Sequence, residues 1–176
     1  YITTYYMKKI ILCGYMASGK STIGLLLASA SGLKYIDLDA VIVQNAGKTI
    51  PQLFQESEIK FRKTEHETLK EIVQSDNGFV LSLGGGTPCY ANNHLFLEQE
   101  DVISIYLKAS IPEIIKRLTA DTTERPLLKG LRGDDLTEYI GQHLFERSYF
   151  YNKAKHSVIT DGKSPEVVVN EIMSLY

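Results

Sequence analysis

Residues 14–21 carry the most specific chemical pattern in the sequence. They read Gly-Tyr-Met-Ala-Ser-Gly-Lys-Ser, with two glycines separated by four residues and followed at once by Lys20 and Ser21. In such a loop the backbone N–H groups and the start of a helix surround a phosphate, the lysine reaches the β- and γ-phosphates, and the hydroxyl binds Mg²⁺. A chance glycine-rich turn is the weaker alternative, because the complete pattern directly follows an apolar run. We predict nucleotide contacts from Gly14, Ala17, Ser18, Gly19, Lys20, Ser21 and Thr22.

Two aspartates follow the second apolar run and offer chemistry on the acceptor side. Asp37 and Asp39 are two residues apart, so in an extended backbone both carboxylates would point to the same side, beside the phosphate-binding loop. One carboxylate could orient Mg²⁺ through water, and the other could bind an acceptor hydroxyl and take its proton. Alternatively, Asp39 only caps the helix that follows.

An arginine between two glutamates could recognise a substrate carboxylate. Glu58, Arg62 and Glu65 have the spacing of one helix face. Arg62 could bind a carboxylate through two parallel hydrogen bonds while a glutamate fixes its rotamer. The alternative is a solvated surface ion pair that contributes a few tenths of a kcal/mol, roughly.

Two irregular segments complete the candidate chemistry. Gly84, Gly85 and Gly86 follow a predicted strand and would let a ligand approach the main chain, unless they are only a flexible turn. Residues 120–135 contain glycines, a proline and mixed charges, which is typical of a mobile lid. Arg125 on such a lid could neutralise transition-state charge. An ordinary surface loop with a solvated arginine is the alternative.

The elements that must position these residues alternate between strands and helices. Strands are expected at residues 9–13, 34–37, 79–83, 102–107 and 157–160. Helices are expected from Lys20 to a C-cap at Gly32, from a Thr49–Gln52 capping box to about residue 74, from a Ser110–Glu113 capping box, and after Ser164. Strands separated by helices predict a parallel sheet covered on both faces, with ligands at the carboxyl ends of the strands.

Length and charge limit the function classes. The 176 residues fit one domain, which we expect over 8–176, with 1–7 as an N-terminal extension and an acceptor-binding helical region at about 40–75. The net charge of −2 gives no reason to expect nucleic acid or an anionic membrane as partner. No signal peptide or membrane-spanning run is apparent. Cys13 and Cys89 suggest neither a disulfide nor a metal site, so we expect reduced thiols in a cytoplasmic protein. We also expect a monomer.

Taken together, these residues resemble shikimate kinase from about Lys8 to the C-terminus. The phosphate-binding loop with Ser21-Thr22-Ile23-Gly24 looks like the first motif of that family, and Asp37-x-Asp39 is similar to its paired aspartates. Residues 50–65 look like its substrate-binding helix, residues 84–86 match its glycine triplet, and residues 125–128, Arg-Pro-Leu-Leu, match its lid motif.

The resemblance also assigns residues that no local pattern singles out. Glu146-Arg147-x-x-x-Tyr151 resembles the motif of the second carboxylate-binding arginine, and Arg117 and Pro165 fall where the family encloses adenine. Two departures are visible. Ala17 stands where the family often has glycine, and residues 148–150 lack a proline that often follows the second arginine.

The resemblance implies a P-loop α/β fold with three α/β/α layers, a five-stranded parallel sheet in the order 2-3-1-4-5, and a mobile lid. The implied reaction is the direct, in-line transfer of the γ-phosphoryl group of ATP to the 3-hydroxyl of shikimate, in chorismate and aromatic amino-acid biosynthesis. Lys20, Asp39 and Arg125 would be catalytic, and Ser21 and Asp37 would serve Mg²⁺. Asp39, Arg62, the residues 84–86 and Arg147 would bind shikimate.

Two other interpretations remain open at this point. Another small-molecule kinase of the same fold, for gluconate or a nucleoside monophosphate, would share the phosphate-binding loop. A nucleotide acceptor would not require two carboxylate-binding arginines beside Asp37-x-Asp39. A non-catalytic ATP-binding switch module would need neither Asp39 nor the lid arginine.

Overall fold

Five parallel β-strands form one sheet in the order β2-β3-β1-β4-β5. The structure is a computed structural model, and it describes residues 7–121 and 125–176. The strands are β1 (Lys9–Cys13), β2 (Lys34–Asp37), β3 (Phe79–Ser82), β4 (Val102–Lys108) and β5 (His156–Ile159). This confirms the implied strand order, and each strand lies within one residue of its predicted bounds.

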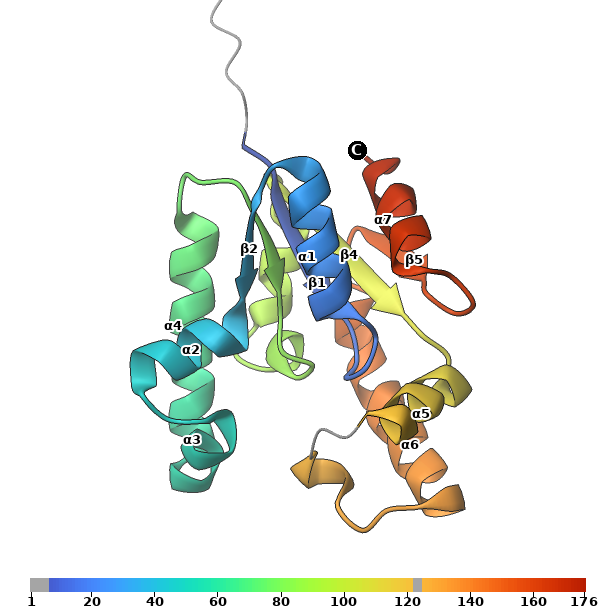
Figure 1. Ribbon diagram of the computed structural model, residues 1–176. Helices are drawn as coiled ribbons and strands as arrows, with labels where there is room; N and C mark the ends of the chain where they lie inside the picture. Colours follow the sequence, from blue (N-terminus) through green and yellow to red (C-terminus); the bar gives the residue numbers. More distant parts are fainter. Residues whose placement is uncertain (1–6, 122–124) are drawn as a thin grey trace, which may run out of the picture.

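The sheet is covered by helices on both faces (Figure 1). Along β1, Ile10 and Leu12 belong to one buried cluster, and Ile11 and Cys13 to another, because successive side chains point to opposite faces. The first cluster includes residues of α1 (Lys20–Ser31) and α7 (Pro165–Met173). The second includes residues of α2 (Leu38–Ala46), α4 (Glu58–Gln74), α5 (Ile111–Ala120) and α6 (Gly133–Tyr151). Three layers result, as the resemblance implied.

The single helix predicted from the Thr49 capping box to about residue 74 is wrong. The box itself forms, with Thr49 Oγ1 accepting from the N–H of Gln52 and the Gln52 side chain accepting from the N–H of Thr49. The helix it opens, α3 (Ile50–Glu56), ends where Ser57 turns extended, with φ −169° and ψ 115°. Ser57 Oγ then accepts from the N–H of Lys60 and opens α4. A serine that caps the next helix therefore interrupts the run.

The capping box predicted at Ser110 is only half formed. Ser110 Oγ accepts from the N–H of Glu113 at 3.3 Å, as predicted. The N–H of Ser110 instead donates to Asp161 Oδ1 at 2.9 Å, and the Glu113 carboxylate accepts from Nε of Arg117 at 3.1 Å. A charged partner replaces the backbone partner of Glu113, because charge-assisted hydrogen bonds are the stronger ones.

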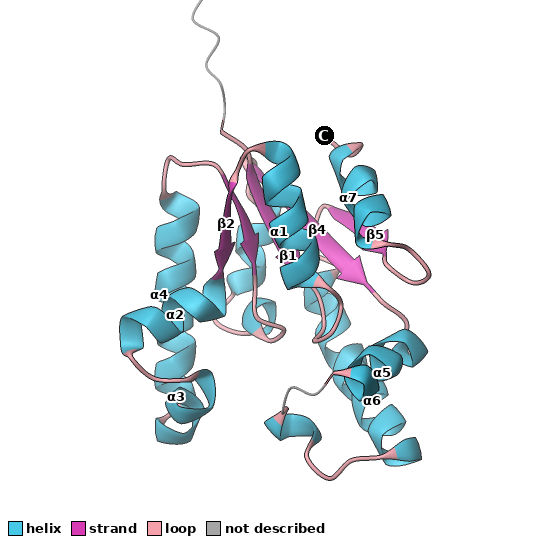
Figure 2. Ribbon diagram, in the orientation of Figure 1, coloured by secondary structure: helices cyan, strands magenta, loops and turns pink. Residues whose placement is uncertain are grey.

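The carboxyl ends of the strands all point the same way, and two helical regions extend past them (Figure 2). One contains α2, α3 and α4; the other contains α5 and α6. Short 3₁₀ helices lie in the connecting segments. These are η1 (Thr87–Cys89) and η2 (Asn93–Glu98) between β3 and β4, and η3 (Pro126–Leu128) between α5 and α6. The C-terminus lies at the opposite end of the sheet (Figure 1).

Parts of two predicted segments lie outside the described residues. These are residues 1–6 of the expected N-terminal extension and residues 122–124 of the expected lid. Within the described ranges, no helix is both long and apolar enough to cross a membrane.

Candidate active site

The loop between β1 and α1 wraps tightly because two of its glycines take conformations closed to other residues. Gly14 has φ 151°, and a Cβ there would lie 2.6 Å from the carbonyl oxygen of Leu107 on β4. Gly19 has φ 97° and forms the N-cap of α1. The N–H of Ser18 donates to the carbonyl oxygen of Tyr15 at 3.1 Å. The loop therefore curls directly over the helix N-terminus, where backbone N–H groups favour a phosphate.

Ala17, which departs from the family's usual glycine, takes a left-handed conformation with φ 60°. A residue with a Cβ pays a steric cost there of roughly 1–2 kcal/mol. The loop thus keeps a glycine-like backbone although the glycine is missing.

Lys20 is held inside the loop by main-chain oxygens. Its Nζ donates to the carbonyl oxygens of Gly14 at 2.7 Å and Tyr15 at 2.9 Å, and it lies 3.5 Å from Ser18 Oγ. Desolvation lowers the pKa of the ammonium group from 10.5 to about 8, and the charges of Arg125 and Arg147 act in the same direction. The thiol of Cys13 and the carboxylate of Asp39 oppose this shift.

Both geometric expectations for Asp39 are wrong. β2 ends at Asp37 and α2 begins at Leu38, so Asp39 lies in the first turn of a helix rather than on an extended strand. The helix cap is Asp37, whose Oδ1 accepts from the N–H of Ala40 at 3.0 Å. Asp39 instead faces the glycine turn, since a Cβ on Gly84 would lie 3.1 Å from Asp39 Oδ1.

The environment of Asp39 suits a proton acceptor. Desolvation raises the pKa of its carboxyl group from 3.8 to about 6, and the charges of Asp37 and Glu65 raise it further. The charges of Lys20 and Arg62 lower it. A carboxylate with a pKa near 6 is ionised at neutral pH yet basic enough to accept a proton.

A cavity of about 280 Å³ brings most of the predicted acceptor residues together. Its polar lining consists of Asp39, Arg62, Glu65, Gly84, Gly85, Gly86, Arg125 and Arg147. Its apolar lining consists of Met16, Ile50, Phe54, Phe61 and Leu127. Charged groups that converge on an apolar-walled cavity are the usual form of a small-molecule site.

Arg62 pairs with a buried carboxylate. Its Nη1 donates to Glu65 Oε1 at 2.8 Å, and Thr87 Oγ1 donates to Glu65 Oε2 at 2.9 Å. Glu65 is only 1% exposed, so the pair is not the solvated surface pair that was the alternative. Glu58, the other glutamate of the predicted set, is exposed and lines a neighbouring cavity rather than this one.

The glycine triplet makes room for two guanidinium groups. A Cβ on Gly86 would lie 2.9 Å from Arg62 Nη2 and 3.2 Å from Arg147 Nη2, and one on Gly85 would lie 3.2 Å from Arg147 Nη1. Arg62 comes from α4 and Arg147 from α6, so two cations from different helices approach the same turn. The hydroxyl of Tyr151, one helical turn after Arg147, donates to the carbonyl oxygen of Gly85 at 2.6 Å. Such a pair of guanidinium groups suits a carboxylate.

A second cavity, of about 300 Å³, joins the phosphate-binding loop to the C-terminal part of the chain. Arg117 and Pro165 line it together with Ser18, Gly19 and Thr22. Arg117 Nη1 donates to the carbonyl oxygen of Ala17 at 3.0 Å, and its Nη2 donates to Thr160 Oγ1 at 3.2 Å. The residues that the resemblance assigns to adenine therefore share one cavity with the loop.

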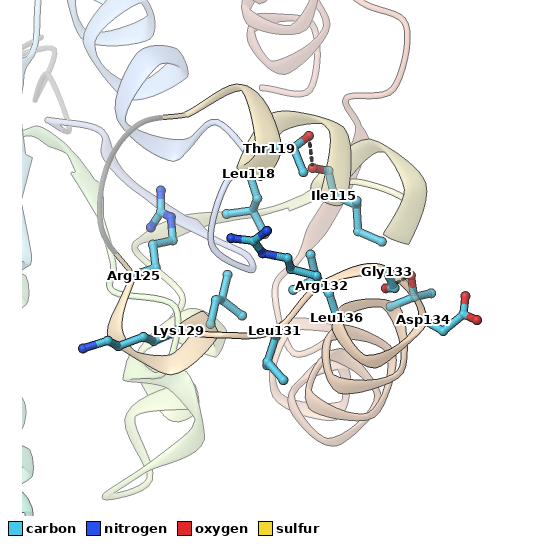
Figure 3. Close-up of a pocket in the computed structure, with 12 residues that line it drawn as sticks. Ile115, Leu118, Thr119, Arg125, Lys129, Leu131, Arg132, Gly133, Asp134 and Leu136 are labelled. Carbon is cyan, nitrogen blue, oxygen red and sulfur yellow. Dashed lines mark hydrogen bonds between the residues drawn. The ribbon is translucent and has the colours of Figure 1, made fainter.

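A larger cavity, of about 860 Å³, lies beside η3 (Figure 3). Leucines of α5, α6 and the segment between them line much of it, and Arg125 and Arg132 add positive charge. Lys20, Asp39 and Arg62 are not among its lining residues. Arg125 lines both this cavity and the acceptor cavity, and its Nη2 lies 3.2 Å from Asp121 Oδ2. We place the chemistry in the smaller cavity, where the charged groups converge.

Ser82 of β3 links the segments that carry Ser21 and Asp37, the predicted Mg²⁺ residues. Asp37 pairs with Ser82 in the sheet, and Ser82 Oγ donates to the carbonyl oxygen of Lys20, the residue before Ser21. Within the described residues, no group of three or more His, Cys, Asp or Glu side chains could hold a metal alone. One hydroxyl and one carboxylate fit Mg²⁺, which in kinases takes few protein ligands and completes its shell with phosphates and water.

The sequence analysis did not identify His66 and Asn93, which support the Glu65 partner of Arg62 through Thr87. Asn93 Nδ2 donates to the carbonyl oxygen of Thr87 at 3.0 Å, and Asn93 Oδ1 lies 2.7 Å from Nδ1 of His66. His66 follows Arg62 by one helical turn, which was a usable signal. Asn93 carried none, because its contacts are set by the turn that follows the glycines.

Comparisons with known proteins point to one family. Residues 16–176 match the family model described as shikimate kinase. A shikimate kinase from Flavobacterium psychrophilum is 50% identical over 167 residues, which cover 94% of this chain and 97% of that protein.

Solved structures with the same fold carry the same description. A shikimate kinase from Bacteroides thetaiotaomicron is 33% identical, with a TM-score of 0.88 and coverage of 96% of this chain and 98% of that chain. A shikimate kinase from Acinetobacter baumannii, solved in complex with shikimate, is 30% identical, with a TM-score of 0.84 and coverage of 96% and 92%.

Proposed function

This chain belongs to the shikimate kinase family, and we propose that it transfers the γ-phosphoryl group of ATP to the 3-hydroxyl of shikimate, giving shikimate 3-phosphate and ADP. Its metabolic role would be in chorismate and aromatic amino-acid biosynthesis. The observation that carries the proposal is the approach of Arg62 and Arg147 to Gly86, with Asp39 at Gly84 in the same cavity. That arrangement matches a small ring with a carboxylate at one end and hydroxyls at the other.

On the acceptor side, the two arginines hold the carboxylate and Asp39 binds a ring hydroxyl. Binding at both ends fixes the ring, so the hydroxyl is presented in one orientation to the γ-phosphate. Asp39 accepts the hydroxyl proton as the new O–P bond forms. The raised pKa of its carboxyl group, about 6, makes it a better base than a solvated aspartate.

On the nucleotide side, loop N–H groups and Lys20 hold the phosphates. A bound γ-phosphate competes with the carbonyl oxygens of Gly14 and Tyr15 for the Lys20 ammonium group, and its charge favours the protonated form. Arg125, at the edge of the acceptor cavity, neutralises charge that develops on the transferring group. Adenine is held between Arg117 and Pro165.

Ser21 and Asp37 are proposed to hold Mg²⁺, directly or through water. A bound Mg²⁺ would neutralise negative charge on the phosphate groups. Asp37 uses one carboxylate oxygen, Oδ1, to cap α2, which fixes the orientation of the carboxylate group.

We also propose that residues 8–176 act as one domain and as a monomer, because every proposed site residue comes from one chain. Sedimentation of the protein with and without both substrates would detect an oligomer.

One assay separates this proposal from its alternatives. ADP release, measured by a coupled assay with shikimate, gluconate, AMP or no acceptor, should be fastest with shikimate. A higher rate with gluconate or AMP would assign the chain another acceptor. ATP binding without acceptor-dependent ADP release would favour the switch module.

A further inference from the structure

The guanidinium group of Arg62 lies among three aromatic rings. Its Cζ lies 3.8 Å from the ring centroid of Tyr90, 5.1 Å from that of Phe54 and 5.2 Å from that of Phe61. All three distances fall within the range of cation–π attraction. Tyr90 is the nearest ring, and it is 39% exposed, whereas Phe61 is buried.

Hydrogen bonds alone do not define the plane of this guanidinium group. Its ion pair with Glu65 uses a single nitrogen, Nη1. Within the described part of the chain, Nε of Arg62 is buried and has no hydrogen-bond partner. One bond at one nitrogen leaves rotation of the plane open, whereas a ring whose centroid lies 3.8 Å from Cζ restricts it.

Tyr90 is presented by a strained turn. The N–H of Asn93 donates to the carbonyl oxygen of Tyr90 at 2.9 Å, and the two residues between them, Ala91 and Asn92, have φ 51° and 55°. These are the features of a type I′ turn, in which alanine is rare. A strained backbone of this kind persists where its surroundings hold it in place.

The surroundings that hold the turn belong to the helix of Arg62. Asn93 is fully buried, and its Oδ1 lies 2.7 Å from Nδ1 of His66, one helical turn after Arg62 on α4. Its Nδ2 donates to the carbonyl oxygen of Thr87, whose side chain binds Glu65. The turn and the arginine are therefore fixed to one face of one helix, which sets the position of the Tyr90 ring.

We propose that Tyr90 is a positioning residue for acceptor recognition, whose ring holds the Arg62 guanidinium plane so that its nitrogens face the substrate carboxylate. This inference rests on the proposed function. A planar guanidinium group recognises a carboxylate through two parallel hydrogen bonds only when its plane is aligned with the carboxylate. Loss of the ring should therefore weaken recognition of the carboxylate without changing KM for ATP.

The test compares Tyr90→Ala, Tyr90→Leu and Tyr90→Phe with wild type. KM and kcat are measured for shikimate and for its carboxamide analogue, which lacks the charge. We expect Tyr90→Ala to raise KM for shikimate about tenfold, equivalent to about 1.4 kcal/mol, with kcat and KM for ATP retained. Its preference for shikimate over the carboxamide should fall by a similar factor. Tyr90→Phe should behave like wild type, because phenylalanine keeps the ring face.

Tyr90→Leu keeps apolar bulk without an aromatic face and serves if Tyr90→Ala fails to fold. It should lose the preference for the carboxylate as Tyr90→Ala does. Tyr176→Ala is the matched control, since the Tyr176 ring also packs against a cation, with its centroid 4.4 Å from Lys8 Nζ, at the far end of the sheet. Unchanged KM and preference in both Tyr90→Ala and Tyr90→Leu would overturn the proposal, and so would a loss in Tyr90→Phe equal to that in Tyr90→Ala.

A readout independent of activity separates this proposal from the proposed function. The NMR signal of the Arg62 Nε–H group in the free protein should show a ring-current shift in wild type and Tyr90→Phe. In Tyr90→Ala the contribution of the nearest ring should be lost, so the shift should shrink to the part that Phe54 and Phe61 cause. If wild type did not phosphorylate shikimate, the proposed function would fail, and this signal would still decide whether Tyr90 orders Arg62. An identical signal in Tyr90→Ala and wild type would overturn the positioning role.

Discussion

The nucleotide region and the acceptor region are built in opposite ways. Eight consecutive residues, 14–21, form the phosphate-binding loop, and its contacts come largely from the main chain. The acceptor cavity is built from side chains on α2, α4 and α6 that meet at the glycine turn. A main-chain site can be read from a contiguous pattern, whereas a side-chain site depends on how distant segments pack.

The two regions should therefore fail in different ways. In the loop, Gly14 cannot accept a side chain, because a Cβ would meet a main-chain oxygen 2.6 Å away. In the acceptor cavity, function depends on charges and on the groups that orient them. Substitutions in the first region should weaken the binding or use of ATP. Substitutions in the second region should weaken the binding or phosphorylation of shikimate.

Lys20→Ala is expected to have the largest effect and to report on the nucleotide region alone. Removing the one cationic side chain of the loop should lower kcat by about three orders of magnitude or more. The fold should persist, but the rise in Tm caused by ATP with Mg²⁺ should shrink. Lys34→Ala, at the exposed start of β2, is the matched control and should leave both values unchanged. Near wild-type kcat in Lys20→Ala would contradict the role of the loop.

Arg125→Ala tests a residue that acts between the two regions. Charge builds on the phosphoryl group as it transfers, so we expect kcat to fall by roughly 10³ with a much smaller change in ATP affinity. Arg132→Ala is the control, since Arg132 shares the large cavity with Arg125 but does not line the acceptor cavity (Figure 3). If Arg125→Ala loses ATP binding and keeps kcat at saturation, Arg125 is a binding residue.

Asp39→Asn should separate catalysis from binding in the acceptor region. Asparagine still binds the hydroxyl but cannot take its proton, so kcat should fall about 10²-fold while KM changes little. For wild type, kcat/KM should rise as pH increases through about 6, where Asp39 ionises, and decline above about 8, where Lys20 loses its proton. Asp39→Asn should lack the rise near pH 6. An unaltered profile would exclude Asp39 as the base.

The same substitution should change stability in the opposite direction to activity. The folded-state pKa of Asp39, about 6, lies above its unfolded value of 3.8, so the folded chain binds more protons between these values. The free energy of unfolding of wild type therefore gains a contribution at low pH that is lost as pH rises through about 6. Asp39→Asn removes this loss and should be more stable than wild type at pH 8. Asp76→Asn, at an exposed residue, is the control and should leave the pH dependence of stability unchanged.

Arg62→Ala should give the signature that is complementary to that of Lys20→Ala. Removing one partner of a buried charged pair costs a few kcal/mol, so KM for shikimate should rise about 100-fold while KM for ATP stays unchanged. Arg62→Lys should recover little, because a point charge cannot replace a planar guanidinium group. Lys63→Ala, the exposed neighbour on α4, is the control. Normal shikimate kinetics in Arg62→Ala would contradict shikimate as the acceptor, and only the assignment as a kinase with a phosphate-binding loop would stand.

The contrast between the regions also explains what the sequence could predict. Apolar runs predicted the five described strands within one residue, and the glycine–lysine pattern predicted a loop between a strand and a helix, where the structure has one. Apolar runs and helix caps did not predict the helix break at Ser57. Its neighbours favour a helix, and its role as the N-cap of α4 depends on its extended backbone, which the sequence does not show. The same patterns failed again at Asp39, because α2 begins directly after β2 with no turn residue between them.

The acceptor site needed more than local patterns. Arg62 has a helical spacing to Glu65 that suggested an ion pair, but the burial of that pair depends on Thr87, which lies in a turn more than twenty residues later. Arg147 has no local signal at all and was found through the resemblance alone. Side chains that meet only through packing leave no periodic trace in the sequence.

Ala17→Gly is expected to have the smallest effect, and it tests whether the main chain shapes the nucleotide region. It removes a loop side chain and leaves the main chain as it is. Ala17 has φ 60°, so removing its Cβ relieves a steric cost of roughly 1–2 kcal/mol, partly offset by the greater freedom of glycine in the unfolded chain. We expect the free energy of unfolding to rise by about 0.5 kcal/mol and KM for ATP to stay within twofold. Ala30→Gly, at an exposed helical position of α1, should instead lose about 1 kcal/mol. Urea titrations of both variants measure the difference. If Ala17→Gly is destabilised as much as Ala30→Gly, the loop is unstrained at residue 17; if its KM for ATP changes strongly, the side chain and not the main chain shapes the site.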